Sequence, residues 1–182
     1  DYYNADDGGQ VDGIRAVRSP GSTLKPLLYG LAIDEGLITP QTVIADVPVN
    51  FSGYQPRNYK ENFNGNVTIE FTLANSLNIP AVKVLDQLQP RNLINALIKA
   101  DFKQIARDKD FLGLSTVLGG CGVTLEELTK LYAAFAHGGH LSDLNFMAAD
   151  SLESGEEILS EPANFMISEI LTSVTRPDLP AQ

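Results

Sequence analysis

A run of leucines and small residues early in the chain has the spacing of a helix. The apolar positions of LLYGLA, residues 27–32, fall on one face of a helix with 3.6 residues per turn. Gly36 follows shortly after, and glycine is the commonest residue at the left-handed position that ends a helix. The pattern predicts a helix over residues 27–35.

The clearest helix pattern is TLEELTKLYAAFAHGG, residues 124–139. Thr124 and Glu127 have the spacing of a capping box, and Gly138 suits the end of the helix. One face of this helix carries five apolar residues: Leu125, Leu128, Leu131, Tyr132 and Phe135. We expect this face to pack on the core.

Further helix starts are marked by threonine and proline. A short helical run, residues 68–76, opens at Thr68. Proline suits the first position of a helix, where its missing N–H costs nothing, so helices are expected to open at Pro80 and Pro90. A last helix is expected from Pro162 to about Val174.

Strand signals are sparse by comparison. Residues 11–19 have the pattern of one short strand, and residues 144–160 that of a short hairpin around a turn-rich centre. Residues 40–66 contain three prolines and two glycines and read as a long extended connection, a kind of segment that often carries function. The balance predicts a helix-rich α+β fold, and residues 1–182 are enough for one domain or a little more.

Charge and cysteine content narrow the function classes. The net charge of −10 disfavours nucleic acid and an anionic membrane surface as partners, and no apolar run is long enough to cross a bilayer. Cys121 is the only cysteine, so no internal disulfide forms. The sequence contains only two histidines in addition to this cysteine, so a metal site is not expected, and no residue pattern indicates a cofactor.

The stretch SPGSTLKPLLYG, residues 19–30, carries the first candidate chemistry. Ser-x-x-Lys is a common tetrapeptide, and serine is a favoured helix cap, so Ser22 and Lys25 have a purely structural explanation. Pro26 offers no backbone donor, which holds Ser22 at the entrance of the helix. A cation there is electrostatically unfavourable for the helix, but a desolvated, neutral Lys25 is a base for the Ser22 hydroxyl.

A second candidate is SLNIP, residues 76–80. In an extended loop residues two apart point the same way, so Ser76 and Asn78 are expected to line one wall of a cleft. Ser76 has the hydroxyl to relay a proton, and Asn78 the amide to hold a substrate carbonyl and support the lysine. The alternative is that both side chains merely cap the helix that follows.

Three ordered blocks together resemble a known family. GSTLKP, then SLNIPAVKVLDQL about fifty residues later, then LGGCGVTLEELTKLYAAFAHGG are similar to the transpeptidase domain of class A penicillin-binding proteins. The extended stretch before the second block, YQPRNYKENFNGNVTIEFTLANSLNIP, also resembles this family. The similarity spans roughly residues 10 to 180.

The resemblance implies a site and a reaction. The acylated serine of the family falls on Ser22, its lysine base on Lys25, and its Ser-x-Asn motif on Ser76 and Asn78. It further implies acyl transfer between peptidoglycan stem peptides, acylation by β-lactam antibiotics, and an extracytoplasmic location as part of a membrane-anchored protein.

One motif of the family is absent. No Lys-Thr-Gly or Lys-Ser-Gly tripeptide occurs in the sequence, although the family uses it for substrate recognition on a sheet strand. We therefore expect a partial transpeptidase domain, lacking sheet strands that include this one, with the remainder of a parent protein as a partner. Two alternatives stay open: a non-catalytic module that binds peptidoglycan or a partner, and a serine β-lactamase, which the lack of a Glu-x-x-Leu-Asn motif disfavours.

Other residues have ordinary structural explanations. Tyr54, Asn58 and Tyr59 lie in the long connection and either line a substrate groove or pin the loop to its own domain. His137 fits a contact with the end of the preceding helix, and Cys121 a small buried position. His140 and the acidic group Glu153, Glu156 and Glu157 indicate no site.

Overall fold

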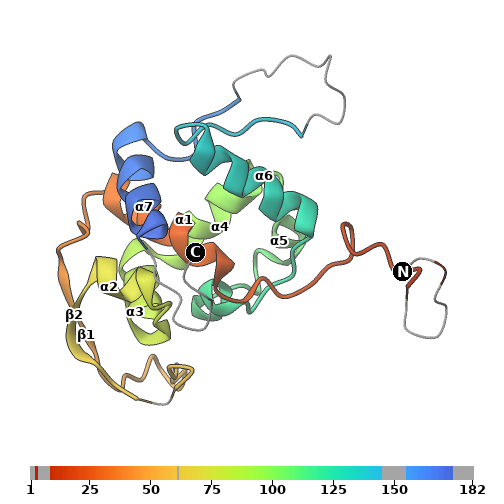
Figure 1. The fold of residues 1–182 in the computed structure, drawn as a ribbon. Helices are drawn as coiled ribbons and strands as arrows, with labels where there is room; N and C mark the ends of the chain where they lie inside the picture. Colours follow the sequence, from red (N-terminus) through yellow and green to blue (C-terminus); the bar gives the residue numbers. More distant parts are fainter. Residues whose placement is uncertain (1–2, 4–8, 61, 145–154, 174–182) are drawn as a thin grey trace.

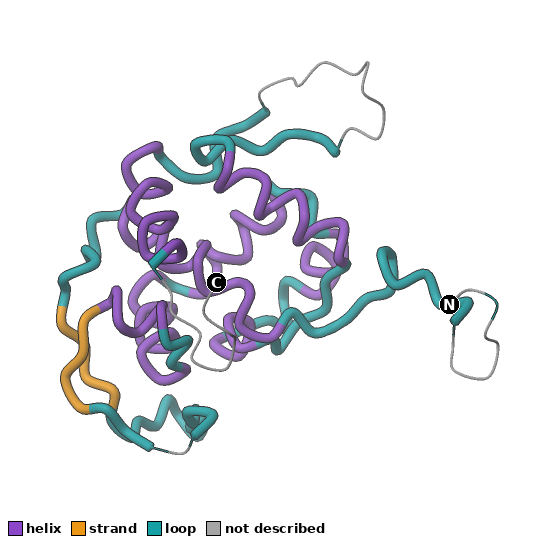
Figure 2. The backbone as a smooth tube through the Cα atoms, in the orientation of Figure 1, coloured by secondary structure: helices purple, strands orange, loops and turns teal. Residues whose placement is uncertain are grey.

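The computed structural model describes residues 3, 9–60, 62–144 and 155–173, and its described part is helix-rich with one small sheet (Figures 1 and 2). In chain order the helices are α1 (Lys25–Asp34), α2 (Ile69–Ala74), α3 (Asn78–Leu88), α4 (Pro90–Lys99), α5 (Lys103–Asp108), α6 (Leu125–Ala136) and α7 (Glu161–Thr172). Two 3-10 turns, η1 (Gly21–Leu24) and η2 (Leu114–Leu118), and the strands β1 (Val43–Asp46) and β2 (Gly65–Thr68) complete the elements. The predicted α+β class is confirmed.

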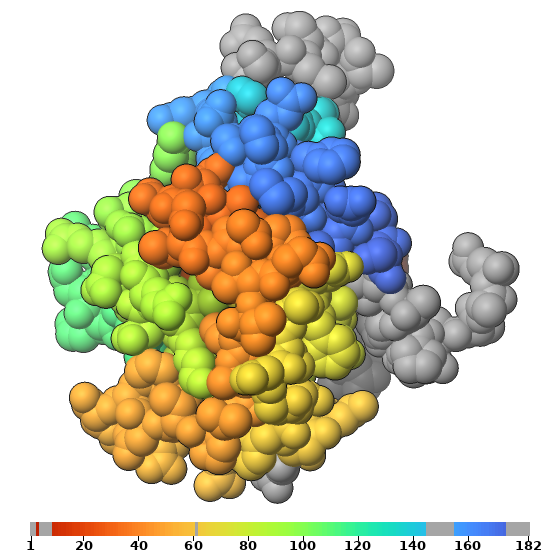
Figure 3. Space-filling view, turned by 90° about the vertical axis from the view of Figure 1, so that its left-hand side faces the viewer, coloured from red at the N-terminus to blue at the C-terminus, as the bar shows by residue number. Residues whose placement is uncertain are grey.

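Helix α1 runs through the centre of the helical assembly. Leu24, Leu27 and Leu28 have no solvent exposure, and α1 packs against α3, α7 and η2. In Figure 3 the orange surface of α1 and the loop after it lies between blue α7 and the yellow β2–α2 segment. The predicted helix is confirmed, beginning two residues earlier than expected, and Gly36 follows it with a φ of 67°.

The helix starts agree with the sequence signals, with one correction. Thr68 caps α2 by accepting a hydrogen bond from the amide of Phe71, and Pro90 is the first residue of α4. Pro80, expected at the first position, is instead the third residue of α3, which begins at Asn78. Any of the first four helical positions tolerates a missing N–H, because none of those groups has a partner within the helix.

Helix α6 has the predicted capping box of Thr124 and Glu127, but its apolar face is only partly buried. Leu131 and Phe135 lie in the core, whereas Leu125 is 56% and Tyr132 40% exposed. The helix lies at the edge of the assembly, so only a narrow stripe reaches the core (Figure 1). Tyr132 instead donates its hydroxyl to the backbone oxygen of Thr23 at 3.0 Å, which ties α6 to η1.

The sheet was missed in the long connection. Strands β1 and β2 pair antiparallel, with Val43 opposite Thr68 and Asp46 opposite Gly65. Each strand has only four residues, mostly half-buried, so no clear alternation marks them in the sequence. The strand expected in residues 11–19 was wrong: its only pairing is a single bridge of Arg18 with Val123.

Short elements without strong periodicity were also missed, and α7 was predicted to within two residues at each end. Helix α5 and the turn η2 were not predicted, because they are only six and five residues long and too short for a clear periodicity. Helix α7 has Ser160 as its cap. Of the hairpin expected over 144–160, residues 145–154 lie outside the described part. Within that part, Glu157 forms an antiparallel bridge with His140.

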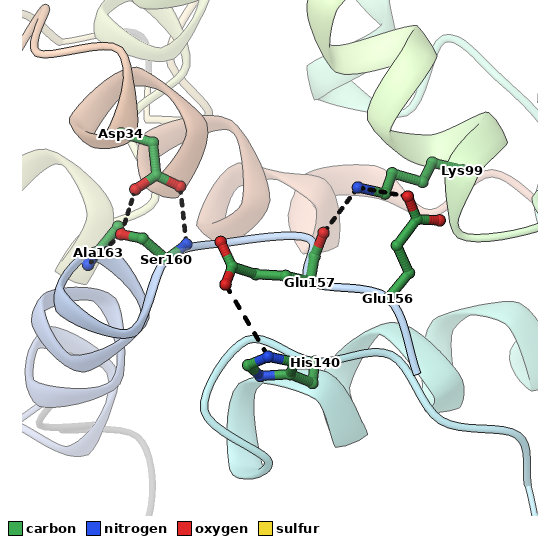
Figure 4. Close-up of polar contacts among 7 residues, drawn as sticks. All are labelled: Asp34, Lys99, His140, Glu156, Glu157, Ser160 and Ala163. Atoms are coloured by element: carbon green, nitrogen blue, oxygen red, sulfur yellow. Dashed lines mark hydrogen bonds and ion pairs between the residues drawn. The ribbon is translucent and has the colours of Figure 1, made fainter. Parts of the chain in front are cut away.

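The segment before α7 is held by two other helices, α4 and α1 (Figure 4). Lys99 at the end of α4 donates to the backbone oxygen of Glu157 at 2.8 Å and pairs with Glu156 at 2.9 Å. Asp34 at the end of α1 accepts from both the amide and the hydroxyl of Ser160. These contacts seat α7 against α1. Within the described residues, no helix is long and apolar enough to cross a bilayer.

Candidate active site

Ser22 lies at the entrance of α1, as predicted. It is half-buried within the turn η1, directly before α1. Pro20 is the N-cap residue of η1, and Gly21, its first residue, has a φ of 57°. Neither η1 nor α1 has a side chain that caps its first turn. Ser22 is therefore not a helix cap, which removes the structural explanation for this serine.

Ser22 faces a cleft of about 440 Å³. The cleft is also lined by Ser76 and Asn78 from the start of α3, and by Asn58 and Tyr59 from the long connection. The structure thus brings the two sequence blocks, more than fifty residues apart, to one site.

Lys25 links the two blocks directly. Its side chain is only 1% exposed, and its amine donates hydrogen bonds to the backbone oxygen of Ser76 at 2.7 Å, the Ser76 hydroxyl at 3.2 Å and the Asn78 amide oxygen at 2.8 Å. An ammonium group has three N–H donors, and these three acceptors use all of them.

Burial changes the acid–base behaviour of this lysine. Desolvation disfavours the charged form and lowers the pKa of Lys25 from 10.5 to about 8. At pH 7 roughly a tenth of the molecules then carry a neutral amine, against fewer than about one in a thousand for an exposed lysine. The burial of Lys25 agrees with the desolvation expected from the sequence.

Ser76 and Asn78 converge on Lys25 by a different geometry from the one expected. They do not lie in an extended loop: Ser76 has a left-handed backbone with a φ of 53°, and Asn78 is the first residue of α3. Strained conformations of this kind cluster at functional sites because the surrounding structure must hold them. The cap of α3 is Leu77, without a side-chain hydrogen bond, so the alternative that Ser76 and Asn78 merely cap this helix is wrong.

The residues weighed in the long connection divide between the two roles. Tyr54 packs against the core, as a pinning residue does. Tyr59 is 97% exposed and, with Asn58, lines the cleft. Asn58 is 5% exposed and also contacts Asp46, a fully buried residue that the sequence interpretation did not single out. The signal for Asp46 was weak: one acidic residue in the apolar run VIADVP.

The remaining candidates behave as expected of structural residues. His137 ends α6, as expected. Cys121 was expected to be buried but is half-buried, and desolvation still raises the pKa of its thiol to about 11, which makes it a poor nucleophile at neutral pH. Among the residues that the structure describes, no three His, Cys, Asp or Glu side chains are grouped as a metal ion would need.

The comparisons with known proteins define the class to which this site belongs. Residues 9–179 match the family model of the penicillin binding protein transpeptidase domain. The chain belongs to this family.

Individual relatives agree with the family. The residues of the three sequence blocks predicted a resemblance to penicillin-binding protein 1C, and the comparison confirms it. The chain is 36% identical to penicillin-binding protein 1C of Escherichia coli, over 93% of the length of this chain. It is 29% identical to penicillin-binding protein 4 of Bacillus subtilis and 30% to penicillin-binding protein 1A of Aquifex aeolicus. The chain spans 22%, 28% and 24% of these three relatives, respectively.

A solved structure shares the fold. The apo transpeptidase domain of penicillin-binding protein 3 from Burkholderia pseudomallei superposes with a TM-score of 0.76 at 22% sequence identity. The match covers 90% of this chain and 55% of that structure. The chain therefore has the fold of the helix-rich part of a transpeptidase domain.

Proposed function

We propose that this chain is the catalytic part of a peptidoglycan D,D-transpeptidase, with Ser22 as nucleophile, Lys25 as base, Ser76 as proton relay and Asn78 as substrate-binding residue. The observation that carries the proposal is the amine of Lys25, which is buried, has a pKa lowered to about 8, and is held by Ser76 and Asn78 beside the cleft that Ser22 lines. An amine of lowered pKa can serve as the base for a serine hydroxyl in acyl transfer. The hydrogen bonds of this amine are to Ser76 and Asn78, and Ser22 lines the same cleft as these two residues.

Acylation is the first half of the proposed reaction. The neutral amine of Lys25 takes the proton of Ser22 as the serine oxygen bonds to the penultimate D-alanine carbonyl of a stem peptide. The C–N bond to the terminal D-alanine then breaks, and its nitrogen receives that proton from Lys25 through the hydroxyl of Ser76. The product is an acyl-serine and free D-alanine.

Transfer is the second half. The amine of a neighbouring stem peptide attacks the acyl-serine and gives a proton to Lys25, which returns it to the departing oxygen of Ser22. A β-lactam acylates the same serine, with the ring amide as the bond that opens. Because peptidoglycan lies outside the cytoplasmic membrane, this function implies an extracytoplasmic location, within a larger membrane-anchored protein whose remainder is a partner of this domain.

The geometry of the amine is suited to the relay. A neutral amine has two donors and one lone pair, so one of the three contacts of Lys25 must change when the proton leaves. The contact of 3.2 Å to the Ser76 hydroxyl is the longest, and a hydroxyl can reverse its role and donate. Ser76 is thereby ready to carry a proton between Lys25 and a leaving group.

Incubation with a fluorescent penicillin, followed by intact mass measurement, tests the proposal. We expect a stable adduct of one penicillin on the chain, absent in Ser22→Ala. Rapid penicillin hydrolysis without an adduct would instead indicate a β-lactamase.

One observation favours a second function, a non-catalytic module that binds peptidoglycan or a partner. The 182 residues contain no Lys-Thr-Gly or Lys-Ser-Gly tripeptide. Peptidoglycan binding that survives in Ser22→Ala, together with no penicillin adduct on the parent chain, would support this function and overturn the transpeptidase.

A further inference from the structure

A buried carboxylate lies outside the cleft, at the end of β1. Asp46 has no exposed surface and accepts four N–H hydrogen bonds. Two come from the Asn58 side-chain amide, at 2.8 and 3.0 Å, and two from the backbone and side-chain amides of Asn64, at 3.0 and 2.6 Å. Among the described residues, amide groups rather than a cation satisfy this carboxylate. A carboxylate buried without a cation is costly, so its place in the fold calls for an explanation.

The carboxylate and the backbone oxygen of Asn62, which accepts from the same NH₂ group at 3.0 Å, together determine which way the Asn58 amide points. A carboxylate only accepts, so the NH₂ group of Asn58 must face Asp46 and its oxygen must face away. That oxygen accepts from the backbone amides of Asn78 at 2.9 Å and Ile79 at 3.3 Å. The first N–H groups of a helix have no partner within it, and Asn58 supplies one for the first turn of α3.

The neighbouring residue holds the side chain of Asn78. The Asn78 NH₂ group donates to the backbone oxygen of Arg57 at 2.8 Å, which leaves its oxygen turned toward the amine of Lys25 at 2.8 Å. Residues 57 and 58 therefore fix both the backbone and the side chain of Asn78. A continuous path of oriented groups runs from Asp46 through Asn58 and Asn78 to Lys25.

We propose that Asp46 and Asn58 are positioning residues that orient Asn78 and, through it, the amine of Lys25. Asp46 does not line the cleft, and Asn58 acts on the reaction through the first turn of α3. The inference rests on the proposed transpeptidase function. It assigns part of the long connection to the chemical step, because these residues turn the amide oxygen of Asn78 toward the amine of Lys25.

Acylation kinetics with a fluorescent penicillin separate the initial binding of the penicillin from the acylation that follows, and we expect the network to affect only the acylation. Asp46→Asn is nearly isosteric but turns an NH₂ group toward that of Asn58. We expect the limiting acylation rate to fall ~10-fold or more, since small misplacements of catalytic groups have effects of this size, while the dissociation constant of the initial complex stays within ~3-fold. Asp86→Asn, the same change at an exposed position on α3, is the matched control and leaves both constants unchanged.

A reciprocal exchange separates orientation from a general loss of stability. In the double variant Asp46→Asn/Asn58→Asp, the new carboxylate at position 58 still accepts from the amides of α3, and the new amide at position 46 donates to it. Of the contacts of Asn58, only the one to the backbone oxygen of Asn62 loses its donor. We expect the limiting rate to return to within ~3-fold of the parent. Ile105→Val, a core truncation in α5, is the control for lowered stability and keeps the parental rate. Should Asp46→Asn not fold, the double variant carries the test alone.

Three results would overturn the inference: a limiting rate of Asp46→Asn within ~3-fold of the parent, an effect confined to the dissociation constant, or a folded double variant that does not recover. A parent chain that forms no adduct overturns the proposed function instead. In that case amide hydrogen exchange still tests the network. Loss of protection at Asn78 and Ile79 in Asp46→Asn supports the positioning role, and unchanged protection contradicts it.

Discussion

Burial of the Lys25 amine is unfavourable for stability, but it prepares the amine to act as a base. Its amine is buried in a helix-rich core, which lowers its pKa to about 8, and it has the hydrogen-bond partners that a buried ammonium needs. An apolar side chain of similar length avoids the desolvation but cannot accept a proton.

Lys25→Met separates these two roles. Without the base we expect acylation by penicillin to slow by ~10²–10⁴-fold, the range typical of general base catalysis. The fold should survive, because methionine fills much the same volume and carries no charge to desolvate. Stopped-flow acylation and thermal unfolding measure the two effects. A variant that acylates at the parental rate would remove Lys25 from the mechanism.

At the residue scale the sequence predicted the groups that act locally. Ser22 and Lys25 are three residues apart, and Ser76 and Asn78 two apart, so each pair can be found by its spacing. Spacing alone left a structural explanation open for both pairs, and the resemblance of three ordered blocks to one family favoured the functional one. Asp46 and Asn58 were not recognised as a pair, because their contact joins residues twelve apart across a hairpin that the sequence did not predict. Their importance depends on tertiary structure, which spacing does not record.

At the scale of elements, the turn that carries Ser22 is packed against the glycine-rich loop after η2. Gly119 has a φ of 93°, and a Cβ atom there would lie 2.6 Å from the backbone nitrogen and 2.7 Å from the Cα of Gly21, next to Ser22. The hydroxyl of Ser19 donates to the backbone oxygen of Gly119 at 2.7 Å. The loop therefore sets the position of Ser22, the proposed nucleophile, from outside the cleft.

Gly119→Ala tests this contact. The left-handed backbone costs about 1 kcal/mol for alanine, and displacement of the Gly21 backbone adds about 1–3 kcal/mol. We expect both a lower free energy of unfolding and slower acylation. Gly36→Ala is the matched control, since its φ of 67° brings similar strain but its Cβ meets nothing within 4 Å. Equal acylation rates in the two variants would show that the loop does not position Ser22.

The seat of α7 gives a second prediction at this scale. Ser160 caps α7 by accepting from the amide of Ala163 and donates its hydroxyl to Asp34 of α1 (Figure 4). Ser160→Ala removes both, and we expect the free energy of unfolding to fall by about 1–2 kcal/mol. Thr129→Ala, which removes an exposed hydroxyl bonded within α6, should change it by less than about 0.5 kcal/mol. Urea denaturation compares the two, and equal losses would contradict the proposed role of the cap.

At the scale of the whole molecule, the sequence predicted the helices better than the sheet. Helices α1 and α6 have the periodicity and caps that local interactions impose, so their ends were predicted to within two residues. Strands β1 and β2 lie nineteen residues apart and depend on each other for hydrogen bonds, so neither is distinct alone. The burial of α6 was overestimated because periodicity identifies an apolar face but not how much of it the rest of the fold covers.

At the same scale, residues from several elements form the hydrogen bonds that hold and orient one amine, that of Lys25. The central helix brings Lys25 to the core, the β1–β2 hairpin and the long connection bring Asp46 and Asn58, and α3 brings Asn78. Asp46, Asn58 and Asn78 form a hydrogen-bonded path that ends at the amine of Lys25. The central claim is therefore that this amine exchanges its proton near neutral pH.

A direct titration of Lys25 by NMR tests that claim. The ε-carbon of isotope-labelled lysine reports protonation, and Lys25→Met identifies the resonance. Because desolvation lowers the pKa to about 8, the charged form prevails below that pH, and the base becomes available as the pH rises through it. The account predicts a midpoint near 8, with acylation rising in parallel. A midpoint at the ordinary value of 10.5 would contradict it.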